Sequence, residues 1–132
     1  MSATEQLTRE TITEYLEIDL ETESWHCRVC DHRIGDARED YKRGLLLHDR
    51  DPREVFEARI AAEYSYAPDP GWCRIVEYYC PGCATQVEAE YAPPGHPLLH
   101  DIEIDVDALK ERQVRLREAD AAAGAADDEV TA

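Results

Sequence analysis

Alternating apolar and polar residues mark several short segments of this chain as strands. The alternation is clearest in EYLEIDL, residues 14–20, where Leu16, Ile18 and Leu20 are separated by acidic residues. A period of two places these side chains on one face, so that one side of the strand is buried and the other is solvated. Three further segments have a strand-like pattern: residues 72–79, 85–91 and 101–106.

Two of these segments flank the CPGC loop and predict a β-hairpin. Residues 72–79 read WCRIVEYY and residues 85–91 read TQVEAEY, in which Val87, Ala89 and Tyr91 alternate with polar residues. The last predicted strand, DIEIDV, places its apolar residues on one face: Ile102, Ile104 and Val106.

A capped helix is predicted over residues 52–64. Asp51 can cap its N-terminus, Pro52 suits the first helical position, and Glu54 lies three residues after the cap, as a capping box requires. The helix carries an apolar stripe that can pack on a sheet: Phe56, Ile60 and Tyr64. Before it, the LLL of residues 45–47 predicts a short buried segment after a charged loop.

The C-terminal part of the chain combines a second helix with a tail. Residues 107–119 are charged and predict a helix with a thin apolar stripe of Leu109, Val114 and Leu116. Residues 118–132, EADAAAGAADDEVTA, contain no aromatic residue and little to bury, which favours an acidic, disordered tail.

Composition limits the classes of partner. The 132 residues include 30 Asp and Glu against 14 Lys and Arg, a formal net charge of -16, which repels nucleic-acid phosphates and acidic membrane surfaces. No apolar run approaches the roughly 20 residues of a membrane span, and the start MSATEQLTRE lacks the features of a signal peptide. We therefore expect a cytoplasmic protein that binds neither nucleic acid nor membrane and whose cysteines stay reduced.

Four cysteines form two CxxC pairs that predict a metal site. WHCRVCDHRIG supplies Cys27 and Cys30, and CPGC supplies Cys80 and Cys83. Four thiolates can close a tetrahedral shell without water, which is the arrangement of a structural zinc site. The 49 residues between Cys30 and Cys80 exceed the usual separation of about 15 to 20 residues, so spacing alone weakens the match.

The residues of the two loops favour the zinc interpretation. Pro81 fixes one backbone angle of the second loop and Gly82 frees the next, which allows amides to turn toward the sulfurs. In the first loop Asp31 readily adopts a left-handed conformation, whereas Ala84 in the second does so less readily.

Other interpretations of the cysteines remain open. The four thiols can be buried and reduced without a metal, or can hold iron in the same shell. A redox dithiol is disfavoured because a thioredoxin-like CxxC opens a helix, whereas Cys80 leads into a predicted strand. The fifth cysteine, Cys73, is interpreted as a small core residue. His26 and His32 are candidates for contacts that support the ligands, because four cysteines already complete a shell.

Together these features predict an α+β fold: a small antiparallel β-sheet with zinc-ribbon-like double CxxC knuckles, one inserted helix and a C-terminal helix. The expected organisation is a flexible N-terminus (1–11), a single zinc-binding domain (12–117) and the tail (118–132). The chain contains no Gly-rich phosphate loop, GxSxG or HExxH motif, so no catalytic or cofactor-binding residue is predicted in it.

The order of these features resembles the gamma subunit of the acetone carboxylase family, which includes the acetophenone carboxylases. The resemblance runs from about residue 12 to 110 and rests on EYLEIDL, WHCRVCDHRIG, DPREVF, RIVEYYCPGCATQVEAEY and PPGHPLLHDIEIDVDAL. Its most specific parts are the second knuckle with its hairpin and the PPGHPLLHDIEID segment.

The resemblance implies a zinc-bearing accessory subunit of a hetero-oligomer. Enzymes of that family convert a ketone and bicarbonate to a 3-oxo acid with ATP and without biotin, and their hydantoinase-like large subunits hold the nucleotide, a divalent metal and the substrate. The family's Zn²⁺ ligands correspond to Cys27, Cys30, Cys80 and Cys83, and no catalytic residue corresponds. The acetone enzymes of the family have a longer gamma subunit, so this short chain favours an aryl ketone carboxylase.

Two other functions fit the residues alone. One is a free-standing zinc-ribbon adaptor, for which the acidic charge disfavours a nucleic-acid ligand. The other is a rubredoxin-like electron carrier with iron in the four-sulfur shell, which the long insertion between the knuckles disfavours.

Overall fold

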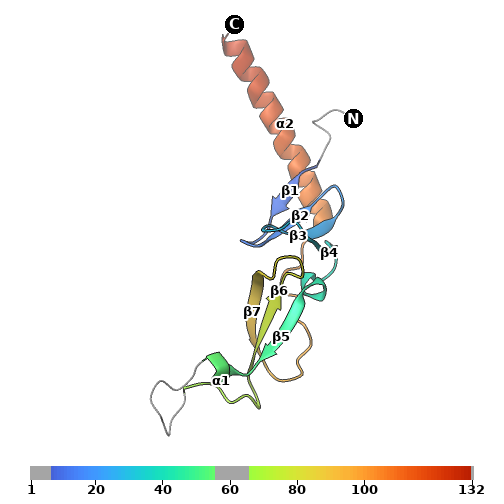
Figure 1. Ribbon diagram of the computed structural model, residues 1–132. Helices are drawn as coiled ribbons and strands as arrows, with labels where there is room; N and C mark the ends of the chain where they lie inside the picture. Colours follow the sequence, from blue (N-terminus) through green and yellow to red (C-terminus); the bar gives the residue numbers. More distant parts are fainter. Residues whose placement is uncertain (1–6, 56–65, 132) are drawn as a thin grey trace.

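Two antiparallel sheets and a long helix form the part of the chain that the computed structural model describes, residues 7–55 and 66–131 (Figure 1). The first sheet has the strand order β1-β2-β3-β4: β1 (Arg9–Thr11), β2 (Leu16–Asp19), β3 (Ser24–Cys27) and β4 (Arg33–Asp36). The second has the order β5-β6-β7: β5 (Leu46–Arg50), β6 (Arg74–Tyr79) and β7 (Gln86–Ala92). The other elements are the 3-10 turn η1 (Tyr41–Gly44), α1 (Pro52–Val55) and α2 (Val106–Thr131). The predicted α+β, zinc-ribbon-like class is confirmed, with two sheets in place of one.

The hydrophobic core lies mainly in the first sheet. Leu16, Ile18 and Leu20 are at most 1% exposed, which confirms the strand predicted from their alternation. Trp25 on β3 is fully buried, its indole N–H donates to a backbone carbonyl 3.1 Å away, and its ring centroid lies 5.5 Å from that of Tyr41. This arrangement buries the largest side chain of the core and satisfies its polar atom.

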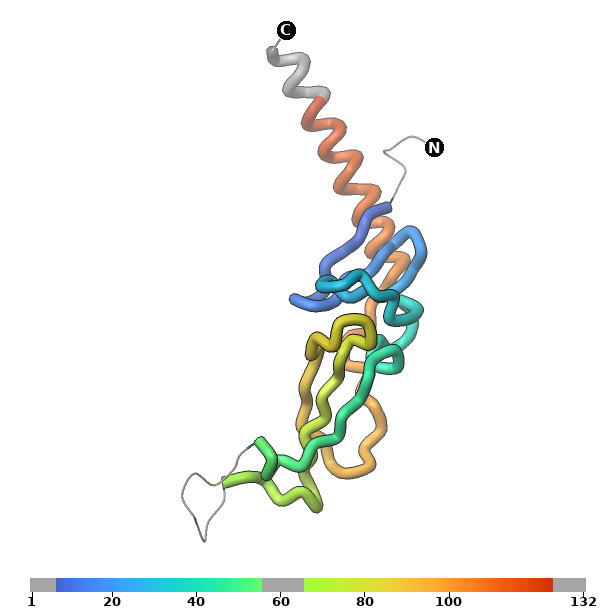
Figure 2. The backbone as a smooth tube through the Cα atoms, in the orientation of Figure 1, coloured from blue at the N-terminus to red at the C-terminus, as the bar shows by residue number. Residues whose placement is uncertain are grey.

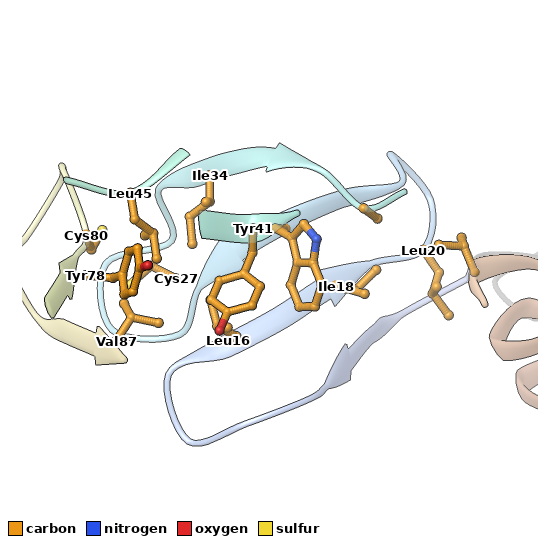
Figure 3. Close-up of a cluster of buried hydrophobic side chains, with 13 residues drawn as sticks. Leu16, Ile18, Leu20, Cys27, Ile34, Tyr41, Leu45, Tyr78, Cys80 and Val87 are labelled. Carbon is orange, nitrogen blue, oxygen red and sulfur yellow. The ribbon is translucent and has the colours of Figure 1, made fainter. Parts of the chain in front are cut away.

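Only one end of the second sheet packs into that core. Figure 3 shows the buried cluster running from Leu20 at one end to Tyr78, Cys80 and Val87 at the other. The remainder of the second sheet and the distal part of α2 extend from the core in opposite directions (Figure 2). The molecule is therefore elongated, with the cysteine loops at the junction between the two sheets.

A buried lysine connects η1 to the second sheet and to residues 99–101. The side chain of Lys42, on η1, is fully buried, and its ammonium donates to Glu90 Oε2 on β7 at 3.0 Å and to the carbonyl of Leu99 at 2.9 Å, and pairs with Asp101 at 3.2 Å. Tyr78 donates to the other oxygen of Glu90 at 2.6 Å. Burial alone would lower the pKa of Lys42, but the hydrogen bonds and charges of the two carboxylates raise it above its usual value.

The hairpin around the second CxxC pair is confirmed as β6 and β7, but the alternation of Val87, Ala89 and Tyr91 does not place all three on one face. A register shift beside Tyr78 makes Val87 an extra, bulged residue, and Val87 turns into the core. Beyond the bulge, Ala89 is exposed and Tyr91 is 60% exposed. A bulge changes which side chains face inward, and simple alternation does not reveal it.

The short buried segment predicted at residues 45–47 is also mostly wrong. Leu45 is buried, whereas Leu46 and Leu47 are 56% and 50% exposed. The latter two lie on β5, an edge strand that pairs with β6 alone, so an apolar run there does not indicate burial.

Residues 101–106 do not form the predicted strand. Val106 instead begins α2, and the preceding residues are irregular. Ile102 and Ile104 nevertheless pack against the core, partly buried. Extended chain can bury alternate side chains without a strand partner, so the alternation correctly predicted a buried face but not a place in a sheet.

Both predicted helices begin close to where the sequence places them. Asp51 accepts from the N–H of Arg53 at 2.9 Å and so caps α1, which is described to Val55. The rest of the helix predicted over 52–64, with its stripe of Phe56, Ile60 and Tyr64, lies outside the described residues. The second helix is longer than predicted: α2 continues through the expected disordered tail to Thr131. Alanine-rich sequence has a high helix propensity even where it buries nothing.

Candidate metal centre

The four cysteines of the two CxxC pairs meet at the junction of the sheets. Cys27 Sγ lies 3.8 Å from Cys83 Sγ, and Cys30 Sγ lies 3.6 Å from Cys80 Sγ. All four sulfurs lie within 4.8 Å of one another, and none is in a disulfide. Folding therefore brings together two pairs that are far apart in sequence.

Both knuckles have the same backbone hydrogen bonds. The N–H of the first cysteine donates to the carbonyl five residues later: Cys27 to His32 at 3.0 Å, and Cys80 to Thr85 at 2.9 Å. The amide four residues later donates back to that cysteine's carbonyl, at 2.9 Å from Asp31 and 2.8 Å from Ala84. The two loops are therefore equivalent turns despite their different sequences.

Each turn needs a residue in the left-handed conformation at its fourth step. Asp31 has φ 67° and Ala84 has φ 61°. The prediction for Asp31 is confirmed, and Ala84 adopts the same conformation although alanine disfavours it. The second knuckle therefore carries a small backbone cost that the turn geometry imposes.

Backbone amides point at two of the sulfurs. The N–H of Val29 lies 3.4 Å from Cys27 Sγ, and the N–H of Gly82 lies 3.4 Å from Cys80 Sγ. Such amides stabilise thiolate ligands in metal knuckles. A Cβ on Gly82 would lie 3.0 Å from both Cys30 Sγ and His32 Cβ, so glycine allows the knuckles to approach rather than supplying a positive φ.

Three cysteines of the cluster have shifted pKa values, and the shifts differ in direction. The hydroxyl and the amide of Thr85 lower the pKa of Cys83 to about 6. Burial raises the pKa of Cys27. The N–H of His32 acts to lower the pKa of Cys30, but loss of water and the neighbouring thiols raise it to about 12. Four sulfurs this close cannot all carry unneutralised charge, and a divalent cation would relieve that repulsion.

A polar network supports the first knuckle. His26 Nδ1 lies 3.1 Å from the carbonyl oxygen of Asp31, and its Nε2 lies 2.8 Å from Ser24 Oγ. Arg9 forms an ion pair with the Asp31 carboxylate and lowers the pKa of that group. The predicted supporting role of His26 agrees with these contacts, which hold Asp31 and hence the turn in place.

The remaining cysteine lies apart from the cluster. Cys73 precedes β6, is half-buried rather than part of the core, and its amide donates to the carbonyl of Asp69 at 3.0 Å. The prediction of a core residue is therefore wrong, because the chain turns at residues 69–73 before the strand begins.

The donor set fits a metal ion. Four ligands placed tetrahedrally about 2.3 Å from a zinc ion lie about 3.8 Å from one another, and the two measured pairs lie at 3.8 and 3.6 Å. Thiolates are soft ligands that select zinc or iron among common cellular metals. Cys27, Cys30, Cys80 and Cys83 can therefore hold one metal ion.

The fold and the site define a class of protein: a small double-sheet protein of zinc-ribbon-like type, clasped by two CxxC knuckles. A family model described as acetone carboxylase gamma subunit matches residues 3–114, which include both knuckles and both sheets. The chain belongs to this family.

Two relatives are similar over most of the chain. The acetophenone carboxylase beta subunit of Aromatoleum aromaticum (strain DSM 19018 / LMG 30748 / EbN1) is 53% identical over 100 residues, which cover 76% of this chain and 78% of that protein. The acetone carboxylase gamma subunit of Xanthobacter autotrophicus (strain ATCC BAA-1158 / Py2) is 30% identical over 89 residues, 67% of this chain. The match spans about half of the latter protein, 52% of its length. Both relatives are subunits of carboxylases.

No described helix is both long and apolar enough to cross a membrane.

Proposed function

We propose that this chain is the small, zinc-containing structural subunit of an ATP-dependent, biotin-independent ketone carboxylase in the cytoplasm. In this proposal it joins hydantoinase-like large subunits, which hold ATP, a divalent metal and the substrate and which form the new carbon–carbon bond. The four-cysteine cluster within the family-matched residues 3–114 is the observation that carries the proposal.

The site suits a structural metal rather than a catalytic one. Cys27, Cys30, Cys80 and Cys83 together would fill a tetrahedral shell, which leaves no position for substrate or water. A bound zinc ion would neutralise the thiolates and cross-link the two sheets. The chain's own part is to hold the sulfurs in place, through equivalent turns and through amides aimed at Cys27 and Cys80.

An aryl ketone is the favoured substrate of the assembly. The relative that shares 53% identity and a similar length is named as an acetophenone carboxylase subunit, whereas the acetone carboxylase subunit is 30% identical and longer. We therefore propose acetophenone or a close analogue in preference to acetone.

Native mass spectrometry of the tagged chain, isolated gently from its own cells, tests the proposal. We expect a large hetero-oligomer that contains hydantoinase-like subunits and one zinc per copy of this chain. An isolated chain of 15.0 kDa with zinc would indicate the free-standing adaptor instead. A coloured protein with iron in the site would indicate the electron carrier.

A further inference from the structure

The second sheet has apolar side chains on both of its faces. Residues paired across neighbouring strands lie on the same side, so the register divides the sheet into two faces. One face, which carries Leu47, Val76, Tyr78 and Ala92, lies against residues 93–98, and the two enclose a cavity of about 120 Å³.

The opposite side, which we call the outer face, carries five apolar and four polar residues: Leu46, Ile75, Tyr79, Ala89 and Tyr91, with His48, Gln86 and the ion pair Arg50–Glu77 at 2.7 Å. At its centre Ile75 and Glu77 are only 7% and 9% exposed. Leu46 and Tyr91, on the two edge strands, are 56% and 60% exposed. Exposed apolar side chains gathered on one face of a sheet mark a candidate interaction site. The outer face also carries two residue types that are enriched at interfaces, tyrosine and arginine.

The charges of this part of the molecule are unbalanced. Residues 46–55 and 66–92 contain seven acidic residues against three arginines, a net charge of -4. Each arginine already holds a carboxylate of this chain: Arg50 that of Glu77 at 2.7 Å, Arg53 that of Asp51 at 2.6 Å and Arg74 that of Asp49 at 2.8 Å. Glu90 is held in turn by Lys42 at 3.0 Å, which leaves a net charge of -3, and this charge lies beside the outer face rather than on it. It is therefore available to positive groups at the rim of a partner.

We propose that the outer face docks on a larger carboxylase subunit whose surface presents apolar side chains ringed by Lys and Arg. This inference rests on the proposed function, because it takes its partner from the same assembly. A second copy of this chain fits less well, since each copy has a net charge of -16 and like charges would face each other.

Two neighbouring leucines of β5 provide a matched test. Leu46 lies on the outer face and Leu47 on the other face, with similar exposures of 56% and 50%. We expect Leu46→Asp to reduce incorporation into the assembly by about tenfold or more, because it places an acid in an apolar contact. Leu47→Asp should change incorporation less than about threefold. Incorporation is measured by native mass spectrometry of co-produced subunits, with circular dichroism and metal content as folding controls.

The outcomes separate this inference from the proposed function. A wild-type chain that joins no large subunit would overturn both. Assembly of Leu46→Asp at the wild-type level, or equal loss with both variants, would overturn the docking face alone. Assembly that does not weaken as salt is raised would contradict a basic rim. In hydroxyl-radical footprinting, Tyr91 should react in the free chain and be protected in the assembly; protection already present in the free chain would mean that the face is covered from within.

Discussion

The two sheets use the same strand geometry but bury their side chains differently. In the first, Leu16, Ile18 and Trp25 are at most 1% exposed, whereas in the second Leu46 and Tyr91 are more than half exposed. The first sheet therefore encloses a core of its own. The second meets that core at one end only, where Tyr78, Cys80 and Val87 join it (Figure 3).

This difference indicates a division of roles. The first sheet and the start of α2 contain most of the buried core, and the docking face proposed above lies on the second sheet. Two sets of contacts hold the second sheet in position: the four-cysteine cluster and the buried ion pairs of Lys42. Loss of either set of contacts should therefore release the second sheet while the first stays folded.

The largest effect should come from the metal site. A structural zinc site contributes on the order of 10 kcal/mol to the folding of small domains, comparable with a whole domain's net stability. Removal of the metal by a chelator, or Cys80→Ser, should therefore lower the melting temperature and release β6 and β7. Hydrogen exchange measured by mass spectrometry should show lost protection in residues 74–92 and retained protection in 16–27.

Cys73→Ser is the matched control, because Cys73 lies outside the cluster. It should leave the melting temperature and metal content unchanged. Unchanged melting of the chelated wild type would contradict a structural metal and favour four reduced thiols without one.

Much of the site follows from sequence, and less of the fold does. The two CxxC pairs identified all four sulfurs because their chemistry is local to each loop. The faces of β7 were missed because a single bulged residue, Val87, reverses the side on which later side chains lie. The sequence around Lys42 did not indicate its burial, because its partners Glu90 and Asp101 lie 48 and 59 positions later in the chain.

Lys42→Met should have the next largest effect. It leaves the carboxylates of Glu90 and Asp101 without their cation, and we expect a loss of about 3 kcal/mol, moderated because the side chain of Asp101 is 37% exposed. Lys110→Met is the control, since the Lys110–Glu23 pair at 3.2 Å lies near the surface and should contribute less than about 1 kcal/mol. Urea unfolding at neutral pH measures both; equal effects would contradict the special role of Lys42.

The pH dependence of stability gives a second test of Lys42. The folded-state pKa of Lys42 is raised, so its contribution is complete below the unfolded value of about 10.4 and is lost as pH rises through the folded value. Burial raises the pKa values of Tyr41 and Tyr78, so these tyrosines add to the loss of stability at alkaline pH. Wild type and Lys42→Met should therefore begin to converge in stability above about pH 10.4 and should meet only above the folded-state pKa of Lys42. A constant difference up to pH 11 would show that Lys42 acts through packing instead.

The equivalence of the two knuckles can be broken at Gly82. A methyl group there would lie 3.0 Å from Cys30 Sγ, so Gly82→Ala should separate the loops and cost about 1 to 3 kcal/mol. The equivalent residue of the first knuckle is Val29, which is 59% exposed, so Val29→Ala should cost less than about 0.5 kcal/mol. Metal affinity, measured by competition with a chromogenic chelator, should fall for Gly82→Ala alone. Equal affinities would mean that the loops adjust without strain.

The smallest effect should be that of Tyr91→Ala in the free chain. Tyr91 is 60% exposed, so its removal should change the free energy of unfolding by less than about 0.5 kcal/mol. Tyr78→Ala provides the contrast, because Tyr78 is fully buried in the same sheet and truncation of a buried aromatic costs about 3 to 5 kcal/mol. An exposed tyrosine that does not stabilise its own chain is expected where a partner molecule buries it. Urea unfolding of the two variants decides this: a loss above about 1 kcal/mol for Tyr91→Ala would show that the outer face belongs to the chain's own core.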